Sequence, residues 1–353
     1  MARRLGMCLG RAGGTALVAV LVAALFAGCL ERKERITVYE NGLVEVTLEN
    51  SSDSLAELEG PDPLPGPFAG WMVETGEELQ DDGKMRHTLR ATALFPPDVP
   101  LPETWAAERD PVAPSALRFP TTVTIETRRD GTWYHFRRVY EPRAWAAVAH
   151  LQDVFLKAPM ANLEGTPPDA LTPEQRQSVA NALARYEAER MILFGRHAFF
   201  EITPERGQDG WLLVEDRLRA VAQEAVVGAG DLLVAPPGET PTEAARRNKA
   251  IEDATTRFKA QLKDALQLAL RQECSYGGTE LQHFFASLDR QQTTFEVTED
   301  LNDDSFEITL QLPGTVMATN AASHAGGAAT WSFRGDELHD RSIELMASSR
   351  VGR

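Results

Sequence analysis

Cysteine is scarce in this chain of 353 residues, which contains only Cys8, Cys29 and Cys274. Cys274 lies at the end of a long helical pattern, and no activating motif surrounds it. A lone cysteine in such a setting is more often a packing residue than a reactive one, so we expect a buried, inert thiol. If Cys8 leaves with a leader peptide and Cys29 is modified, no intramolecular disulfide can form.

The motifs of common catalytic and metal sites are also missing. The chain has no HExxH or CxxC motif, no Walker A loop, and no G-x-S-x-G or G-x-G-x-x-G in a strand-to-helix context. No two histidines are three or four residues apart, so a metal site would need ligands assembled by the fold. The histidines are His87, His135, His150, His197, His283, His324 and His339. We expect no catalytic residue, no metal and no cofactor, and a Ser–His–Asp set assembled by the fold remains open.

One acidic run, Asp300-Leu301-Asn302-Asp303-Asp304, is similar to the start of a calcium loop. An EF-hand loop has glycine at its sixth position and a bidentate glutamate at its twelfth. The sequence has Ser305 and Gln311 at these positions. We therefore interpret the run as a polar turn between the segments Phe295–Val297 and Phe306–Leu312.

The net charge is strongly negative. The chain has 36 basic and 52 acidic residues, a net charge of −16. Residues 1–28 contain three arginines, so the rest has 33 basic and 52 acidic residues, a net charge of −19. This charge argues against nucleic-acid binding and against lying flat on an anionic membrane. The hydrophobic fraction of 43% and charged fraction of 25% are typical of a folded globular protein.

The N-terminus has the three parts of a secretory signal peptide. Basic residues such as Arg3 and Arg11 precede the uncharged stretch Thr15–Ala27. That stretch of 13 residues is shorter than the roughly 20 apolar residues of a membrane span. The small residues Ala27 and Gly28 then precede Cys29, as a peptidase that cleaves there requires.

The motif Phe26-Ala27-Gly28-Cys29 resembles a bacterial lipobox, with phenylalanine where leucine is usual. The resemblance implies that the thiol of Cys29 carries a diacylglyceryl group, with acyl chains such as palmitate, and anchors the protein in a membrane. An ordinary cleaved signal peptide and an uncleaved anchor are the alternatives. Leu30 replaces the aspartate that often retains lipoproteins in the inner membrane. By resemblance to those sorting rules, an outer-membrane location is favoured in a Gram-negative envelope.

The first third of the chain predicts β-hairpins. The segment Arg35–Glu49 alternates apolar and polar residues on both sides of Asn41-Gly42, which predicts a two-residue type I′ turn. The pairs Asp82-Gly83 and Asp130-Gly131 predict further turns, the last between strands Thr121–Thr127 and Thr132–Tyr140. Proline-rich loops are expected at Gly60–Phe68 and Pro96–Pro120, because proline removes a ladder donor.

The middle of the chain predicts helices. Thr172-Pro173-Glu174-Gln175 and Thr240-Pro241-Thr242-Glu243 each have the sequence of a capping box with proline at the first helical position. Apolar residues at helical spacing extend these starts into long helices. The expected segments are 145–155, 172–200, 209–228, 242–273 and 281–288.

The last part of the chain returns to strands, at Ser305–Leu312, Thr330–Phe333 and Ser342–Ser349. We predict an α+β fold, with an antiparallel sheet built from N- and C-terminal hairpins and a large helical insertion packed on it. Two small β units beside a separate bundle are the alternative. The expected regions are a signal peptide (1–28), a lipidated tether (29–34), a β-hairpin region (35–141), a helical region (142–290) and a C-terminal β region (291–353), with 35–353 forming one domain.

Both ends of the predicted folded body resemble the LppM-like ectodomains of bacterial lipoproteins. The resemblance rests on Leu312-Pro313-Gly314-Thr315-Val316, Thr319-Asn320-Ala321, Thr330-Trp331-Ser332-Phe333 and the opening strands ITVYENGLVEV, about a quarter of the chain. It implies a sheet built from both ends with helices packed on it, an envelope function without a known reaction, and a core position for Trp331. It carries over no catalytic residue.

These observations predict a membrane-anchored envelope lipoprotein that binds or scaffolds a partner and is not an enzyme. The expected partners are the membrane, through lipid on Cys29, and either an envelope protein or an apolar ligand; nucleic acid is not expected. A lipid-tethered hydrolase and a carrier of apolar molecules are the alternatives. A cleft with a buried polar constellation would favour the hydrolase, and an apolar pocket would favour the carrier.

Overall fold

The computed structural model describes most of the chain from Leu30 onward. The described residues are 30–58, 64–67, 70–80, 83–97, 99–106, 117–163, 166, 170–206, 209–225 and 239–352. They form two compact units, which are considered one at a time. The β unit comprises described residues up to Ala147 and from Leu288 onward, and the helical unit comprises those from Val148 to Ser287.

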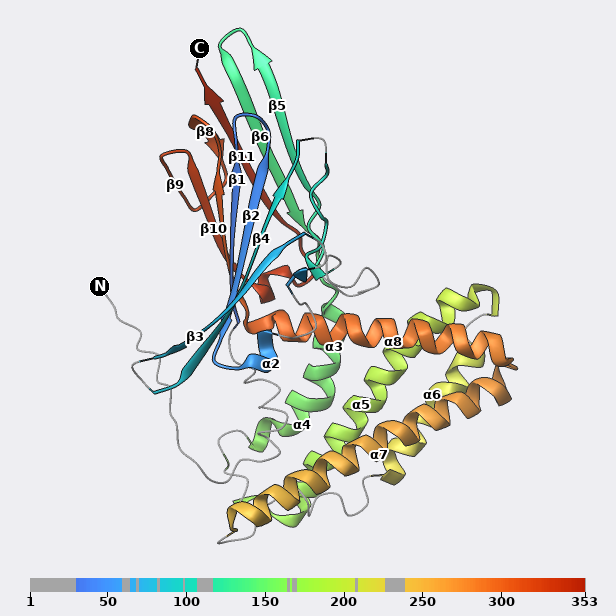
Figure 1. Ribbon diagram of the computed structural model, residues 1–353. Coiled ribbons are helices and arrows are strands. Elements are labelled where there is room, and N and C mark those ends of the chain that lie inside the picture. Colours follow the sequence, from blue (N-terminus) through green and yellow to red (C-terminus); the bar gives the residue numbers. More distant parts are fainter. Residues whose placement is uncertain are drawn as a thin grey trace. The chain divides into compact units, whose positions relative to one another are not determined.

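The β unit contains two sheets (Figure 1). The larger sheet has the strand order β3-β4-β2-β1-β7-β10-β9. Its strands are β1 (Glu31–Val38), β2 (Val44–Ser52), β3 (Met72–Leu79), β4 (Met85–Phe95), β7 (Ser305–Gln311), β9 (Ser323–Ala325) and β10 (Ala328–Arg334). The smaller sheet has the order β5-β6-β11-β8. Its strands are β5 (Thr121–Arg128), β6 (Gly131–Tyr140), β8 (Thr315–Thr319) and β11 (Ile343–Val351).

Each sheet contains strands from both the N-terminal and the C-terminal part of the sequence. In the larger sheet β1 pairs antiparallel with β2 and parallel with β7, and in the smaller sheet β6 pairs antiparallel with β11. The predicted α+β class and the sharing of strands between the N- and C-terminal segments are therefore confirmed. The parallel β1–β7 pair was not expected. Parallel neighbours need a long crossover connection, and the helical insertion provides one.

The hairpin turns follow the glycine positions, but the first is longer than expected. The N–H of Tyr39 donates to the carbonyl of Leu43, so three residues lie between them instead of the two of a type I′ turn. Gly42, the last of the three, has φ +85°. This is the left-handed conformation required after a type I turn in a three-residue hairpin loop, and glycine adopts it without steric cost.

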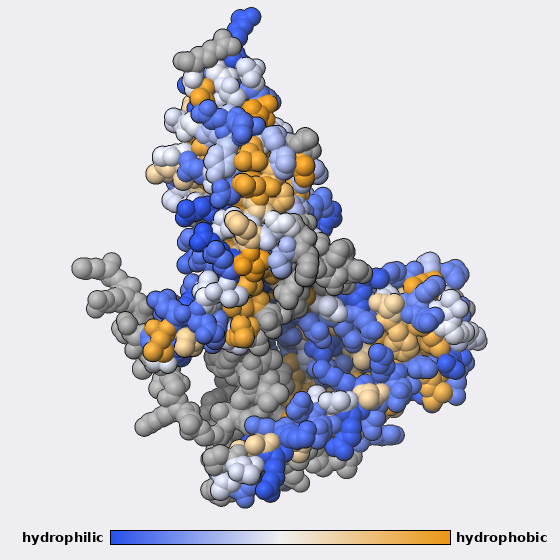
Figure 2. Space-filling view, viewed as in Figure 1, coloured by the Kyte–Doolittle hydropathy of each residue, from blue (hydrophilic) through white to orange (hydrophobic). Residues whose placement is uncertain are grey.

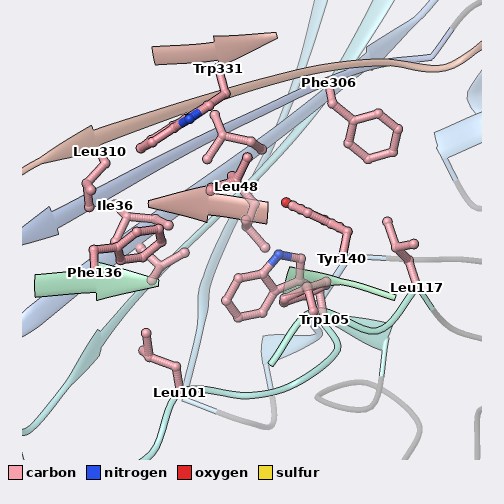
Figure 3. Packing of buried hydrophobic residues seen from close by; sticks show 14 of the residues in the cluster. Ile36, Leu48, Leu101, Trp105, Leu117, Phe136, Tyr140, Phe306, Leu310 and Trp331 are labelled. Carbon is pink, nitrogen blue, oxygen red and sulfur yellow. The ribbon is translucent and has the colours of Figure 1, made fainter. Parts of the chain in front are cut away.

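Strand alternation places apolar side chains between the two sheets. Ile36, Val46, Leu310 and other residues of the larger sheet are buried in one cluster with Phe136 and Tyr140 of the smaller sheet. Figure 3 shows side chains from strands of both sheets, with those of the connecting residues Leu101, Trp105 and Leu117, in this shared interior. Trp331 is 5% exposed, so its expected place in the core is confirmed.

Most of the segment expected to be a tether, residues 29–34, belongs to the folded β unit. Residues 31–34 lie in β1, paired with both β2 and β7. Leu30 is buried, and its carbonyl accepts a hydrogen bond from the N–H of Ser305. The polar residues of this segment predicted a tether outside the folded body. Hydrogen bonds to β2 on one side and β7 on the other instead satisfy its backbone groups and hold it in the sheet.

The short helices of the described chain lie mainly between strands or next to longer helices. They are α2 (Leu55–Leu58), α3 (Ala146–Gln152), η3 (Asp153–Lys157), α4 (Ala158–Met160), η4 (Ala161–Leu163), η6 (Pro204–Arg206), η8 (Leu301–Asp303) and η9 (Gly335–Leu338). The long helices are α5 (Pro173–Ile202), α6 (Asp209–Ala225), α7 (Pro241–Glu273) and α8 (Gly278–Asp300). The segment Phe295–Val297 therefore belongs to α8, which extends past the predicted end at Leu288, and the residues after it form η8.

Both predicted capping boxes form. The hydroxyl of Thr172 accepts from the N–H of Gln175 at 3.2 Å, and the Gln175 side chain accepts from the N–H of Thr172 at 2.8 Å. Thr240 and Glu243 make the same reciprocal pair at the start of α7. These bonds satisfy backbone donors that have no partner within the first helical turn.

The helical unit has its own apolar interior. Trp211, Phe199 and Phe284 are completely buried, and the centroid of the Trp211 ring lies 5.5 Å from that of Phe199 and 6.4 Å from that of Phe284. Cys274 is buried as predicted, with its Sγ 3.6 Å from the carbonyl oxygen of Gly210. The visible face of the unit is mainly hydrophilic (Figure 2). No helix among the described residues is long and apolar enough to cross a membrane.

Candidate functional site

A pocket of about 550 Å³ lies against the β3–β4 hairpin of the β unit. This volume is within the range of about 300–1,000 Å³ of small-molecule sites. The hairpin forms one wall, and α2 and residues 65–67 line the pocket from other parts of the chain. Its apolar lining comes from Leu55, Leu58, Pro65, Pro67, Val73 and Leu89. The pocket is therefore suited to a ligand with an apolar part.

The register of the hairpin explains which side chains reach the pocket. Val73 pairs with Ala91, Thr75 with Leu89, and Glu77 with His87. Because side chains of alternate residues share one face of a strand, all of these point to the same side of the hairpin. Ala91 is completely buried. The wall of the pocket is therefore the same face of the larger sheet that faces the core at Ala91, extended toward the turn of the hairpin.

The lining changes from apolar to polar along the hairpin. Val73 and Leu89 lie toward the interior, and Glu77 and His87 lie nearer the turn. The Nδ1 atom of His87 is 3.4 Å from Oε1 of Glu77; the side chain of His87 is 19% exposed and that of Glu77 is 65% exposed. This contact is within ion-pair distance, but it lacks hydrogen-bond geometry, and Nδ1 of His87 is buried without a hydrogen-bond partner.

Two exposed apolar side chains follow at the end of the hairpin. Leu79 and Met85 pair with each other on the face that lines the pocket and are 67% and 41% exposed. In Figure 2, apolar residues lie among hydrophilic ones on this hairpin. The polar end of the pocket is therefore bordered by an apolar rim.

The pocket lies at the end of the larger sheet where the chain enters from Cys29. Glu31, the first residue of β1, pairs with Ser51, which pairs in turn with Thr88 in the wall of the pocket. Cys29 lies outside the described residues.

A second cluster, which the sequence analysis missed, lies between the two sheets. Nη1 of Arg138 is 2.6 Å from Oε2 of Glu34, and the side chains are 0% and 6% exposed. Burial alone would lower the pKa of Arg138, but the Glu34 carboxylate and the Tyr140 oxygen raise it overall, so the guanidinium stays charged. Burial also raises the pKa of Tyr140 well above its ordinary value, which keeps the phenol neutral.

Alternation could have revealed this pair. Glu34 has the same parity as Ile36 and Val38 in β1, and Arg138 has the same parity as Phe136 and Tyr140 in β6. A charged residue in the apolar phase of a half-buried strand signals a buried charge that needs a partner. Arg138 also lies 4.7 Å from the centre of the Phe119 ring. The surrounding aromatic rings enclose the pair, so its role is structural.

Comparisons with known proteins identify no family. No protein-family model matches the chain, and no curated protein matches its sequence. The folded domain of LppM from Mycobacterium tuberculosis, solved by NMR, aligns with 93% of this chain and 94% of its own, at 10% identity and a TM-score of 0.27. A similarity at this level supports no conclusion about fold or function.

One histidine contacts a serine, which is one of the two contacts that a Ser–His–acid hydrolase would need. Nδ1 of His135 is 2.8 Å from Oγ of Ser348, and its Nε2 is 4.0 Å from Glu126. His135 and Ser348 are cross-strand partners in the smaller sheet, as are Trp133 and Glu126 beside them. Arg128 hydrogen-bonds to Glu126 and lowers its pKa, so this carboxylate is already engaged. Cross-strand pairing explains the cluster without a catalytic role.

The acidic run at the end of α8 is engaged within the β unit. Oδ2 of Asp304 is 2.6 Å from Nε of Arg32, and residues 301–303 form the short helix η8. Among the described residues, no group of three or more His, Cys, Asp or Glu side chains is placed to hold a metal ion.

Proposed function

We propose that the protein is an envelope lipoprotein, anchored through lipid on Cys29, whose β unit binds an apolar ligand in the β3–β4 pocket. The apolar pocket at the end of the sheet nearest Cys29 is the observation that carries the binding role. The signal-peptide pattern and the lipobox-like motif carry the anchoring role. In a Gram-negative envelope, Leu30 after the cysteine favours the outer membrane.

The anchor explains how the protein stays at a membrane. Each buried methylene group contributes about 0.8 kcal/mol, and a single acyl chain gives only marginal binding. The two or three chains of a bacterial lipoprotein give stable attachment. Because residues 31–34 lie in β1, the anchor is joined to the folded body by a very short segment. A ligand that leaves the bilayer would therefore meet the pocket at the anchored end of the β unit.

Substitution of Cys29 tests the anchor. We expect wild-type protein to incorporate labelled fatty acid in its native host and to fractionate with membranes, and Cys29→Ser to lose the label. Cys274→Ala is the control and should retain it, because Cys274 is buried in the helical unit. Label that persists in Cys29→Ser, or a wild-type protein without label, would contradict the assignment.

A substitution that fills the pocket tests the binding role. The full chain is held in zwitterionic nanodiscs and titrated with the neutral fluorophore N-phenyl-naphthylamine, with empty nanodiscs as the blank. We expect saturable binding that Thr75→Trp weakens at least about tenfold, because the indole occupies pocket volume. Glu74→Trp places the same ring on the opposite face of β3 and should bind as wild type does. Binding that is absent in wild type, or equal in the two variants, would refute the proposal.

A further inference from the structure

We infer that the ligand of the β3–β4 pocket is a single-chain amphiphile with a cationic ammonium head group. Its tail would lie against Val73 and Leu89, and its head group would lie between Glu77 and His87. This inference rests on the proposed binding function and specifies its ligand class.

The position of the polar groups sets the direction of the ligand. Along the pocket-lining face, the pairs Val73–Ala91 and Thr75–Leu89 come first from the interior, and the pair Glu77–His87 lies two residues nearer the turn on each strand. Two residues of a strand span about 7 Å. A purely apolar ligand that fills the pocket would cover Glu77 and His87 without satisfying them, which costs free energy. An amphiphile avoids this cost because its polar end reaches these groups.

The acceptors at this end favour a ligand that donates hydrogen bonds. The carboxylate of Glu77 accepts only, and Nδ1 of His87 lacks a hydrogen-bond partner and accepts when it is unprotonated. An ammonium group has three donors and can bond to both. A hydroxyl has one donor, and a carboxylate has none and would be repelled by Glu77. The expected order of affinity is therefore ammonium, then hydroxyl, then carboxylate.

The nearby cations are already paired, so they do not reverse this preference. Arg86 lies 2.7 Å from Glu31, and Lys84 lies 3.2 Å from Asp53. Both positive side chains are thus neutralised by carboxylates at the same end of the sheet. Glu77 and His87 are the ionisable residues among those that line the pocket in the described chain. The carboxylate of Glu77 therefore supplies a negative charge at this end of the pocket that no cation among the described lining residues cancels.

Competition among three amphiphiles with the same tail tests the inference. Wild-type protein in zwitterionic nanodiscs at about pH 8, where carboxylates are ionised and primary amines are protonated, is loaded with N-phenyl-naphthylamine and titrated with dodecylammonium, dodecanol or laurate. We expect dodecylammonium to displace the probe at roughly three- to tenfold lower concentration than dodecanol, the range for a charge-assisted hydrogen bond at a partly exposed site. Laurate should be the weakest competitor.

Glu77→Gln separates the head-group effect from partition into the nanodisc, because the disc is the same for both proteins. This variant should bring dodecylammonium and dodecanol to similar potency and leave dodecanol itself unchanged. Glu78→Gln removes the neighbouring charge, which lies on the other face of β3, and should keep the wild-type order.

The outcomes distinguish the inference from the proposed function. Equal potency of the three amphiphiles, laurate as the strongest competitor, or an unchanged order in Glu77→Gln would overturn the cationic head group while the apolar pocket stands. If none of the three displaces the probe from wild-type protein, the binding function itself fails.

Discussion

Glu34 of β1 and Arg138 of β6 form an ion pair across the two sheets, with 2.6 Å between Oε2 and Nη1. Nε of Arg138 also donates to the Thr121 hydroxyl at 2.7 Å, and Nη1 lies 3.3 Å from the hydroxyl of Tyr140. The second oxygen of Glu34 and Nη2 of Arg138 are buried without hydrogen-bond partners in the described chain. The pair therefore fixes how the sheets face each other, at a cost in desolvation.

Removal of one partner should destabilise the β unit strongly. Glu34→Leu or Arg138→Met leaves an uncompensated charge in the interior, and such changes cost about 3–5 kcal/mol in the free energy of unfolding. The double variant Glu34→Leu with Arg138→Met should recover much of that loss, because it leaves no buried charge. Urea denaturation of the detergent-solubilised protein measures the four free energies. Additive losses in the double variant would show that the two side chains act independently.

A stacked histidine should make stability depend on pH. The ring of Trp145 stacks on His339 at 4.5 Å and on Phe295 at 5.5 Å between centroids. Burial lowers the pKa of His339, partly offset by Asp336 and Asp340. The pKa of a histidine in the unfolded chain is about 6.5. Around and below that pH the unfolded chain therefore binds more protons than the folded one. The stability from neutral His339 is complete above this pH and is lost as the pH falls through the lowered pKa.

We expect His339→Phe to keep the stack and to flatten the fall of melting temperature between about pH 7 and about pH 5, the interval that contains an ordinary histidine pKa. His324→Gln, at an exposed position, should retain the wild-type slope. If His339→Phe has the same slope as wild type, the charge on His339 does not contribute to it.

Two glycines of the helical unit should respond to alanine in opposite directions. A Cβ at Gly195 would lie 2.6 Å from Cη2 of the completely buried Trp211. Gly195→Ala should therefore destabilise by about 1–3 kcal/mol through overpacking. A Cβ at Gly210 would meet Sγ of Cys274 at an ordinary 3.5 Å, so Gly210→Ala should stabilise α6 by up to about 1 kcal/mol. Thermal unfolding followed by circular dichroism measures both, and equal shifts would contradict the close contact.

Hairpin turns and helix starts could be predicted from the sequence because each depends on a few neighbouring residues. The alternation around Asn41-Gly42 identified the first hairpin, and the capping sequences at Thr172 and Thr240 fixed the starts of α5 and α7. The last predicted helix ended at Leu288, whereas α8 continues to Asp300, because the short apolar segment Phe295–Val297 is too brief for its periodicity to indicate a helix.

The remaining features depend on contacts between distant segments. The parallel pairing of β1 with β7, the Glu34–Arg138 pair and the pocket each join residues far apart in the chain. No local periodicity specifies which strand neighbours which. The parity of Glu34 and Arg138 marked them as inward-facing, but only the fold identifies each as the partner of the other.

The parallel β1–β7 ladder has a consequence for biogenesis. One edge of β1 stays open until β7 has been synthesised, after the entire helical unit. Because β1 must wait for a strand so distant in sequence, folding is slowed. Until β7 pairs with it, the open edge of β1 can pair with other chains and promote aggregation. We expect a chain that stops before Ser305 to be degraded or to aggregate.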